Sequence, residues 1–189
     1  MQLILASQSP RRRELLTQAG YDFEVMIPDE AAECGIRPGE STAELVARYA
    51  YQKALNIRPR ICHDAIIVAC DTVADLNGQI LGKPIDRQHA EQMLQMLSGK
   101  KHLVLSGLCV WKLPSGTPQV RVATSELHMA ELSVAQIQSY LDSGDWIGKS
   151  GAFGYQDGHA WLALISGTAS NVVGLPLDLL QEMLVHHLD

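Results

Sequence analysis

Apolar and polar residues follow one another along the chain in a pattern that predicts interleaved strands and helices. Strands are expected at residues 3–6, 23–27, 65–70, 103–111, 119–129 and 161–165, with a hairpin over 73–81. Apolar residues at helical spacing predict helices that begin near residues 10, 41, 86, 133 and 176. Because residues 65–70 are apolar without alternation, this strand is expected to be covered on both faces. The pattern predicts an α/β protein with a mixed sheet flanked by helices.

Turn and capping residues separate these elements. Asn77-Gly78 is a strong signal for the tight turn of a hairpin. The glycine-rich stretch 148–158 is expected to be a flexible loop with few core residues. Since no internal repeat or long linker interrupts the 189 residues, one domain spanning 1–189 is expected. Candidate helix caps are Ser9, Ser41 with Glu44, Asp86, and Ser133 with Gln136.

Composition narrows the classes of protein. The chain is 47% hydrophobic and 19% charged, as in ordinary globular proteins, and its net charge of −6 argues against a broad nucleic-acid-binding face. The longest apolar run, 65–70, is too short to cross a membrane, and the N-terminus does not resemble a signal peptide. The four cysteines lack disulfide-framework or zinc-type spacing, so reduced thiols are expected. These features predict a cytoplasmic protein without nucleic-acid or membrane partners.

The first predicted helix begins with an arrangement that favours a bound anion. Ser9 and Pro10 suit a helix start, and Arg11, Arg12 and Arg13 fill the first turn. A helix N-terminus carries about half a positive charge, so cations there are unfavourable on their own. Free backbone N–H groups and guanidinium groups together bind phosphate well. The pattern therefore indicates a phosphate site, and a solvated basic turn is the alternative.

A second group of polar residues follows the predicted buried strand. Asp71, with Thr72 after it, is expected where that strand ends, and it could bind a divalent metal, activate water or cap a turn. Lys83 in a Gly-Lys-Pro loop offers a point charge for phosphate, whereas Lys53 by default lies on a helix surface. Gln156 carries both a donor and an acceptor and can therefore read a base edge.

Taken in order, several short motifs resemble the Maf family of nucleoside triphosphate pyrophosphatases, over nearly the whole chain. They are 6–12 (ASQSPRR), 53–54 (KA), 71–73 (DTV), 82–84 (GKP), 97–99 (LSG), 151–154 (GAFG) and 171–177 (NVVGLPL). The resemblance implies an elongated mixed sheet with a central cleft, related to inosine triphosphate pyrophosphatase, and frequent homodimers. It also implies hydrolysis of a nucleoside triphosphate to a monophosphate and pyrophosphate with a divalent cation, Mg or Mn.

The resemblance also assigns residues. Asp71 resembles the family's proton acceptor, and Glu33 matches its second acidic residue and, with Asp71, the metal ligands. Because the loop before it is offset from the family pattern, Glu30 is the alternative to Glu33. Lys83 completes the catalytic set. The remaining matches are substrate-binding. Arg12, Thr72 and Gln156 match positions tied to substrate choice in the family, whereas Ser7, Arg11 and Lys53, like Lys83, match its phosphate-handling positions.

Two positions favour the subgroup that acts on dTTP and UTP. The 7-methyl-GTP subgroup tends to have Trp at the position of Arg11, and Gln156 matches the dTTP/UTP subgroup. Gly148 and Ser150 depart from the common Asp and Ala, which leaves the base open. The chemistry fits independently, because attack of water on phosphorus builds charge that metal, Arg and Lys stabilise.

Two other functions remain as alternatives. A nucleotide-binding regulatory protein, for instance in cell division, would keep the pocket with little turnover. Polynucleotide binding through the arginine turn is disfavoured by the acidic net charge and by an aromatic content of 5%.

Overall fold

The computed structural model describes the backbone of residues 1–188, with side chains through residue 185. Strands and helices interleave along this part of the chain, as the sequence pattern predicts. The strands are β1 (Gln2–Ala6), β2 (Phe23–Val25), β3 (Ala65–Leu76), β4 (Gln79–Leu81), β5 (Lys101–Lys112), β6 (Gln119–Met129) and β7 (Leu162–Ser166). The α-helices are α1 (Pro10–Gln18), α2 (Thr42–Ile57), α3 (Arg87–Leu97), α4 (Val134–Ser143), α5 (Ala169–Val173) and α6 (Leu177–Leu188).

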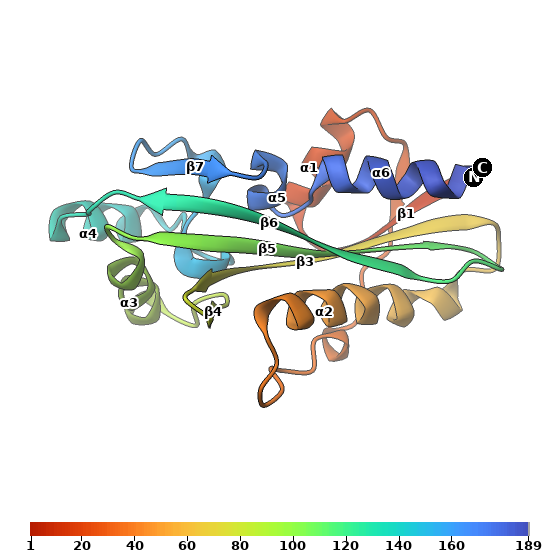
Figure 1. The fold of residues 1–189 in the computed structure, drawn as a ribbon, viewed down its shortest axis with the longest axis horizontal. Helices are drawn as coiled ribbons and strands as arrows, with labels where there is room; N and C mark the ends of the chain where they lie inside the picture. The colour runs from red at the N-terminus through yellow and green to blue at the C-terminus, as the bar shows by residue number, and fades with distance from the viewer. Residues whose placement is uncertain (189) are drawn as a thin grey trace.

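The described strands form one mixed sheet in the order β2-β1-β3-β5-β6-β7, with β4 beside β3. β1 runs parallel to β2 and β3, whereas the other pairings are antiparallel. The long strands β3, β5 and β6 extend along the long axis of the molecule (Figure 1). Helix α2 covers one face of the sheet, and α1, α5 and α6 cover the other (Figure 1). This is the elongated mixed sheet flanked by helices that the sequence predicts.

The first half of β3 is buried on both faces, which confirms the prediction from its unbroken apolar run. Val68 and Cys70 pack in one core cluster with residues of α6. Ile67 and Ala69, which point to the opposite face, pack in another cluster with Ala54 and other residues of α2. β3 is therefore held between two helical layers.

A gap in the sheet opens beside the second half of β3. β1 ends opposite Ala69, and β4 begins to pair only at Ala74. Between these points, Asp71 and Thr72 lie on a strand edge that no other described strand covers. The prediction that the strand ends before Asp71 is wrong, because β5 continues to pair with β3 there, with Gly107 opposite Asp71.

A glycine in β5 explains how closely α2 approaches the sheet. A Cβ atom added to Gly107 would overlap the backbone carbonyl of Val46. Only a residue without a side chain allows this contact between helix and strand. The close approach seats α2 over the middle of the sheet and brings Lys53 to β3.

The predicted helix caps form with one exception. Both capping boxes are present, and Asp86 caps α3 by accepting from the His89 N–H. Helix α1 begins where the sequence predicts, but the side chain of Ser9 makes no capping hydrogen bond. The Ser9 N–H instead donates to Ser7 Oγ over 3.1 Å, which shows that the loop before α1 turns back on itself.

The structure corrects one predicted strand boundary and one predicted loop. The strand expected over 23–27 ends at Val25, because β1, its partner, is short. The stretch 148–158 contributes more to the core than the sequence predicts. It forms two short 3₁₀ turns, 150–152 and 155–157, and buries Ala152 and Phe153 in the core.

Candidate active site

A cavity of about 630 Å³ lies beside the uncovered edge of β3. Its lining combines the start of α1, the loop before α2, the middle of β3 and the turns at 148–156. The predicted site residues all line it, namely Ser7, Arg11, Arg12, Glu33, Lys53, Asp71, Thr72, Lys83 and Gln156. Glu30 also lines the cavity, whereas Arg13 turns away and donates to the Gln8 carbonyl over 3.2 Å. The structure therefore brings the predicted set together in one cleft.

The centre of the cleft is an ammonium group between two carboxylates. Lys53 Nζ lies 2.5 Å from Asp71 Oδ1 and 2.8 Å from Glu33 Oε1. The side chains of Lys53 and Asp71 are 8% and 11% exposed, whereas that of Glu33 is 44% exposed. The surface position expected by default for Lys53 is wrong, because α2 approaches the sheet closely. A charge this buried needs such partners.

This arrangement fits a divalent cation of the Mg type. Lys53 shows that one cation reaches both Asp71 and Glu33 in this geometry. Mg²⁺ is commonly held by one or two carboxylates together with substrate phosphates and water. Of the two candidate glutamates, Glu33 makes the ion pair to Lys53, and Glu30 lies exposed at the lining of the cleft. The donor set therefore suits a cation shared with a phosphate substrate.

Arg12 joins the start of α1 to the opposite end of the chain. Its Nε donates to the Gly174 carbonyl over 2.7 Å, and its Nη2 donates to Thr72 Oγ1 over 3.3 Å. Its Nη1 lies 3.4 Å from Ser7 Oγ. Thr72 Oγ1 in turn contacts Ser106 Oγ at 2.7 Å. The guanidinium is therefore fixed at the floor of the cleft before any ligand binds.

Arg11 is the less restrained of the two arginines. Its Nη2 donates to the Gly148 carbonyl over 3.1 Å. Partial burial lowers the pKa of Arg11, and the neighbouring charge of Arg12 lowers it further. Two guanidinium groups and the free N–H groups of α1 thus face one region, which an anion would stabilise.

The turns at 150–152 and 155–157 form another side of the cleft. The Ser150 hydroxyl donates to the Thr72 carbonyl over 3.0 Å, and the Gly151 N–H donates to the Gly82 carbonyl over 3.0 Å. These bonds attach the turns to β3 and to the loop that carries Lys83. Gln156 and Lys83 are exposed and lie at the cleft lining, where each can meet a ligand.

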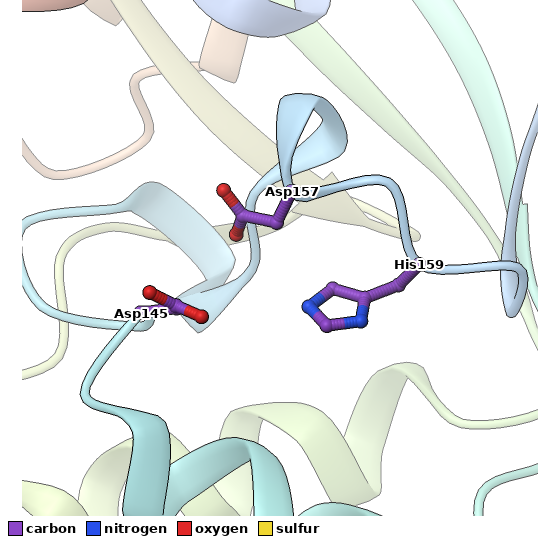
Figure 2. A group of neighbouring side chains, drawn as sticks. All are labelled: Asp145, Asp157 and His159. Carbon is purple, nitrogen blue, oxygen red and sulfur yellow. The ribbon is translucent and has the colours of Figure 1, made fainter.

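A second group of ligand-type side chains lies outside the cavity lining. The group consists of Asp145, Asp157 and His159 (Figure 2). Each offers one possible metal-ligand atom, and these three atoms lie within 4.8 Å of one another. Asp157 is already paired with Lys149 Nζ. None of the three side chains lines the cavity, so a cation bound here would not be shared with a phosphate in the cleft.

Sequence reasoning missed three participants. The Gly174 carbonyl accepts from Arg12, Thr72 and the Cys70 thiol, and a backbone acceptor gives no residue-type signal. Asp157 and Tyr140 hold the turn that contains Gln156. In the sequence, Asp157 could have been noticed because it directly follows Gln156, whereas Tyr140 gives no such signal.

Two bacterial proteins of solved structure share the fold of this chain. The Ham1 protein of Staphylococcus aureus matches with a TM-score of 0.53 and 14% identity over 99% of this chain and 100% of that chain. A HAM1 protein of Coxiella burnetii matches with a TM-score of 0.52 and 15% identity over 98% and 99%. The fold is thus of the Ham1 type. Within that class, residues 2–187 match the family model of Maf-like proteins, and the chain belongs to this family.

Three bacterial relatives with 37–50% sequence identity share one name. A Rhodopirellula baltica protein named dTTP/UTP pyrophosphatase is 50% identical over 96% of this chain and 80% of its own length. Proteins of the same name from Symbiobacterium thermophilum and Bdellovibrio bacteriovorus are 45% and 37% identical over more than nine-tenths of both chains. None of the helices described here is long and apolar enough to span a bilayer.

Proposed function

We propose that this chain is a nucleoside triphosphate pyrophosphatase that acts on dTTP and UTP. It would cleave the bond between the α- and β-phosphates and release a nucleoside monophosphate and pyrophosphate. Membership of the Maf-like family and the shared name of its relatives support this proposal. We further propose that the chain works as one domain in the cytoplasm, as a homodimer, and removes unwanted nucleotides.

The observation that carries the proposal is the Lys53 ammonium between Asp71 and Glu33, in the cleft that also contains Arg11 and Arg12. A triphosphate needs positive groups along its length, and its hydrolysis needs a base near the attacked phosphorus. This cleft holds both kinds of group. A binding protein without turnover has no need of a buried carboxylate beside the anion site.

The residues divide the chemistry as follows. Arg11, the N–H groups at the start of α1 and Lys83 bind and orient the phosphates. Asp71 accepts a proton from the attacking water, and Lys53 holds the Asp71 carboxylate in place. Asp71 and Glu33 would hold a Mg²⁺ or Mn²⁺ ion, which supplies charge stabilisation at the phosphoryl oxygens when bound.

Product analysis tests the proposal. Wild-type protein is incubated with a panel of nucleoside triphosphates and Mg²⁺ or Mn²⁺, and pyrophosphate, orthophosphate and nucleotide products are quantified. We expect pyrophosphate and a monophosphate, most rapidly from dTTP and UTP. Orthophosphate with a diphosphate would contradict the proposed bond cleavage. Tight nucleotide binding without any product would instead favour the regulatory alternative.

Assembly and location have separate tests. Light scattering after size exclusion is expected to give twice the 20.7 kDa chain mass. A monomer at micromolar concentration would contradict the homodimer, and recovery outside the cytoplasmic fraction would contradict the location.

A further inference from the structure

We propose that Lys149, Asp157 and Tyr140 form a clamp that fixes the turn carrying Gln156 and thereby sets the preference of the cleft for one base over another. The inference rests on the proposed function, because it assigns the control of substrate choice at that site. The three are positioning residues, which act through Gln156 and do not bind the reacting phosphates.

The contacts of the clamp fasten both ends of one short turn. The Asp157 carboxylate accepts from Lys149 Nζ and, over 3.3 Å, from the Tyr140 hydroxyl. The Tyr140 oxygen also accepts from the Gly154 N–H over 3.2 Å. Gly154 precedes the turn 155–157, and Asp157 ends it. A single phenol therefore holds the turn at its entrance and at its end.

The ion pair of the clamp is shielded from water. The Lys149 and Asp157 side chains are 11% and 15% exposed. Ion pairs on an open surface contribute little, whereas shielded pairs interact more strongly and leave a costly charge when one partner is removed. This pair can therefore hold the turn in one position.

Gly154 provides the space for the ion pair. A Cβ atom added there would overlap both the Asp157 carboxylate and Lys149 Nζ. The φ angle of Gly154 is −120°, which any residue can adopt, so its small size rather than its backbone freedom is needed. Gly154→Ala is therefore a way to displace the ion pair without removing either charge.

Tyr140 supplies a rigid anchor. Its side chain is 5% exposed and packs with Ile137 and Leu141 in the core around α4. Burial raises the pKa of Tyr140, and the charge of Asp157 raises it further, so the phenol keeps its proton at neutral pH. The hydroxyl therefore remains a donor to Asp157.

Gln156 connects the clamp to the substrate. It lies within the clamped turn and lines the cavity, with an exposed side chain. Its amide offers a donor and an acceptor, which suits the edge of a base, but only if its position is fixed. The proposed phosphate-binding groups, on α1 and at Lys83, lie outside the clamped turn, so disturbing the clamp should alter base preference more than phosphate binding.

Lys149 has a rival role as a direct phosphate ligand, because it also lines the cavity. The two roles predict opposite effects. A direct ligand would be released by Asp157→Asn, which would strengthen binding of every nucleotide, and Lys149→Met would weaken binding of all of them equally. In a clamp, both substitutions have the same effect, a loss of preference between bases.

The test measures binding rather than turnover, by calorimetry with non-hydrolysable α,β-methylene analogues of dTTP and dGTP. The variants are Lys149→Met, Asp157→Asn, Gly154→Ala, Tyr140→Phe and Gln156→Ala. We expect the ratio of the two affinities to fall about tenfold when the turn is released, since small misplacements of a binding group are costly. Asp157→Asn should add nothing to Gln156→Ala, because both act through the same amide.

Two control variants accompany the test, and a thermal melting curve of each variant shows that it is folded. Lys149→Arg retains the charge and should retain most of the preference. Asp145 is an exposed carboxylate beside Asp157 but outside the clamp (Figure 2), so Asp145→Asn should change nothing. An unchanged affinity ratio in folded Asp157→Asn, a uniform loss for both analogues, or no preference in the wild type would overturn the clamp. Because binding needs no hydrolysis, a wild type that binds selectively but releases no pyrophosphate would contradict only the proposed function.

Discussion

Two sides of the cleft are built in different ways. The reaction side, defined by Lys53 and Asp71, stands on α2 and β3, and this ion pair is almost fully buried. The turn side, defined by Lys149, Gln156 and Asp157, stands on turns between α4 and β7, and Gln156 is exposed.

The difference separates two tasks. Regular elements packed into the core hold charged groups in fixed, shielded positions, which suits proton transfer and charge stabilisation. Turns tolerate changes of sequence and length, which suits the choice of substrate. In this protein the reaction side should set the type of bond cleaved, and the turn side should set the base.

The largest effect is expected from Asp71→Asn, which removes the proton acceptor of the reaction side. The rate of pyrophosphate release should fall about a thousandfold, within the usual range for a general base. Asp75 on the same strand is a matched control, since it is also buried but binds Thr42 and the Gly78 N–H. Asp75→Asn should lower the melting temperature and leave turnover nearly intact. Equal loss of turnover in both variants would contradict a special role for Asp71.

A second prediction concerns stability on the reaction side. Lys53→Met leaves the Asp71 carboxylate buried without its ammonium partner, which should lower the free energy of unfolding by about 3 kcal/mol. Adding Asp71→Asn should restore part of that loss, because the unpaired charge disappears. Urea denaturation of the single and double variants measures this. A double variant less stable than Lys53→Met would contradict the account.

A third prediction concerns the pH dependence of the free energy of unfolding, which His102 beside the turn side should control. This side chain is 3% exposed and contacts the Phe153 ring edge-on at 5.1 Å, and burial lowers the pKa of His102 to about 4. The unfolded chain binds the proton near pH 6.5, so the stabilisation is complete above that value and is lost as the pH falls. Between pH 7 and pH 5 about 2 kcal/mol of stability should be lost through His102.

The measurement is denaturation across that pH range in wild type and His102→Phe. The variant should lose most of the pH dependence, whereas the exposed His63→Gln should retain it. The same slope in all three proteins would refute the assignment to His102.

The smallest expected effect is a difference in stability between substitutions at the N-caps of α4 and α1. Ser133 closes a capping box on α4, which anchors the turn side, and Ser133→Ala should cost about 1 kcal/mol. Ser9 starts α1 but its side chain caps nothing, so Ser9→Ala should cost less than half as much. Thermal unfolding of the two variants compares them, and equal losses would show that Ser9 does cap in solution.

Local features of the fold were predictable from the sequence. The capping boxes, the Asn77-Gly78 hairpin and the doubly covered first half of β3 depend on neighbouring residues and on simple periodicity. The site residues were predicted partly from charge at a helix start and partly from family resemblance. Their meeting in one cleft agrees with that prediction, while their individual roles stay predictions.

The remaining features depend on distant parts of the chain. Asp71 lies within a strand because β5 continues to pair with β3 there, and its other edge is uncovered because β1 ends early and β4 begins late. None of this is visible in the residues around Asp71. Lys53 is buried because Gly107 lets α2 approach β5. The turn 155–157 is fastened by Tyr140 on α4, which donates to Asp157 and accepts from the Gly154 N–H. Periodicity cannot report such contacts.

The separation of tasks is tested most directly by comparing single-turnover rates of dTTP and dGTP in wild type, Asp71→Asn and Gln156→Ala. Asp71→Asn should slow both substrates by the same factor and keep their ratio. Gln156→Ala should change the ratio while pyrophosphate remains the product. A change of ratio in Asp71→Asn, or an equal loss for both substrates in Gln156→Ala, would contradict the division between the reaction side and the turn side.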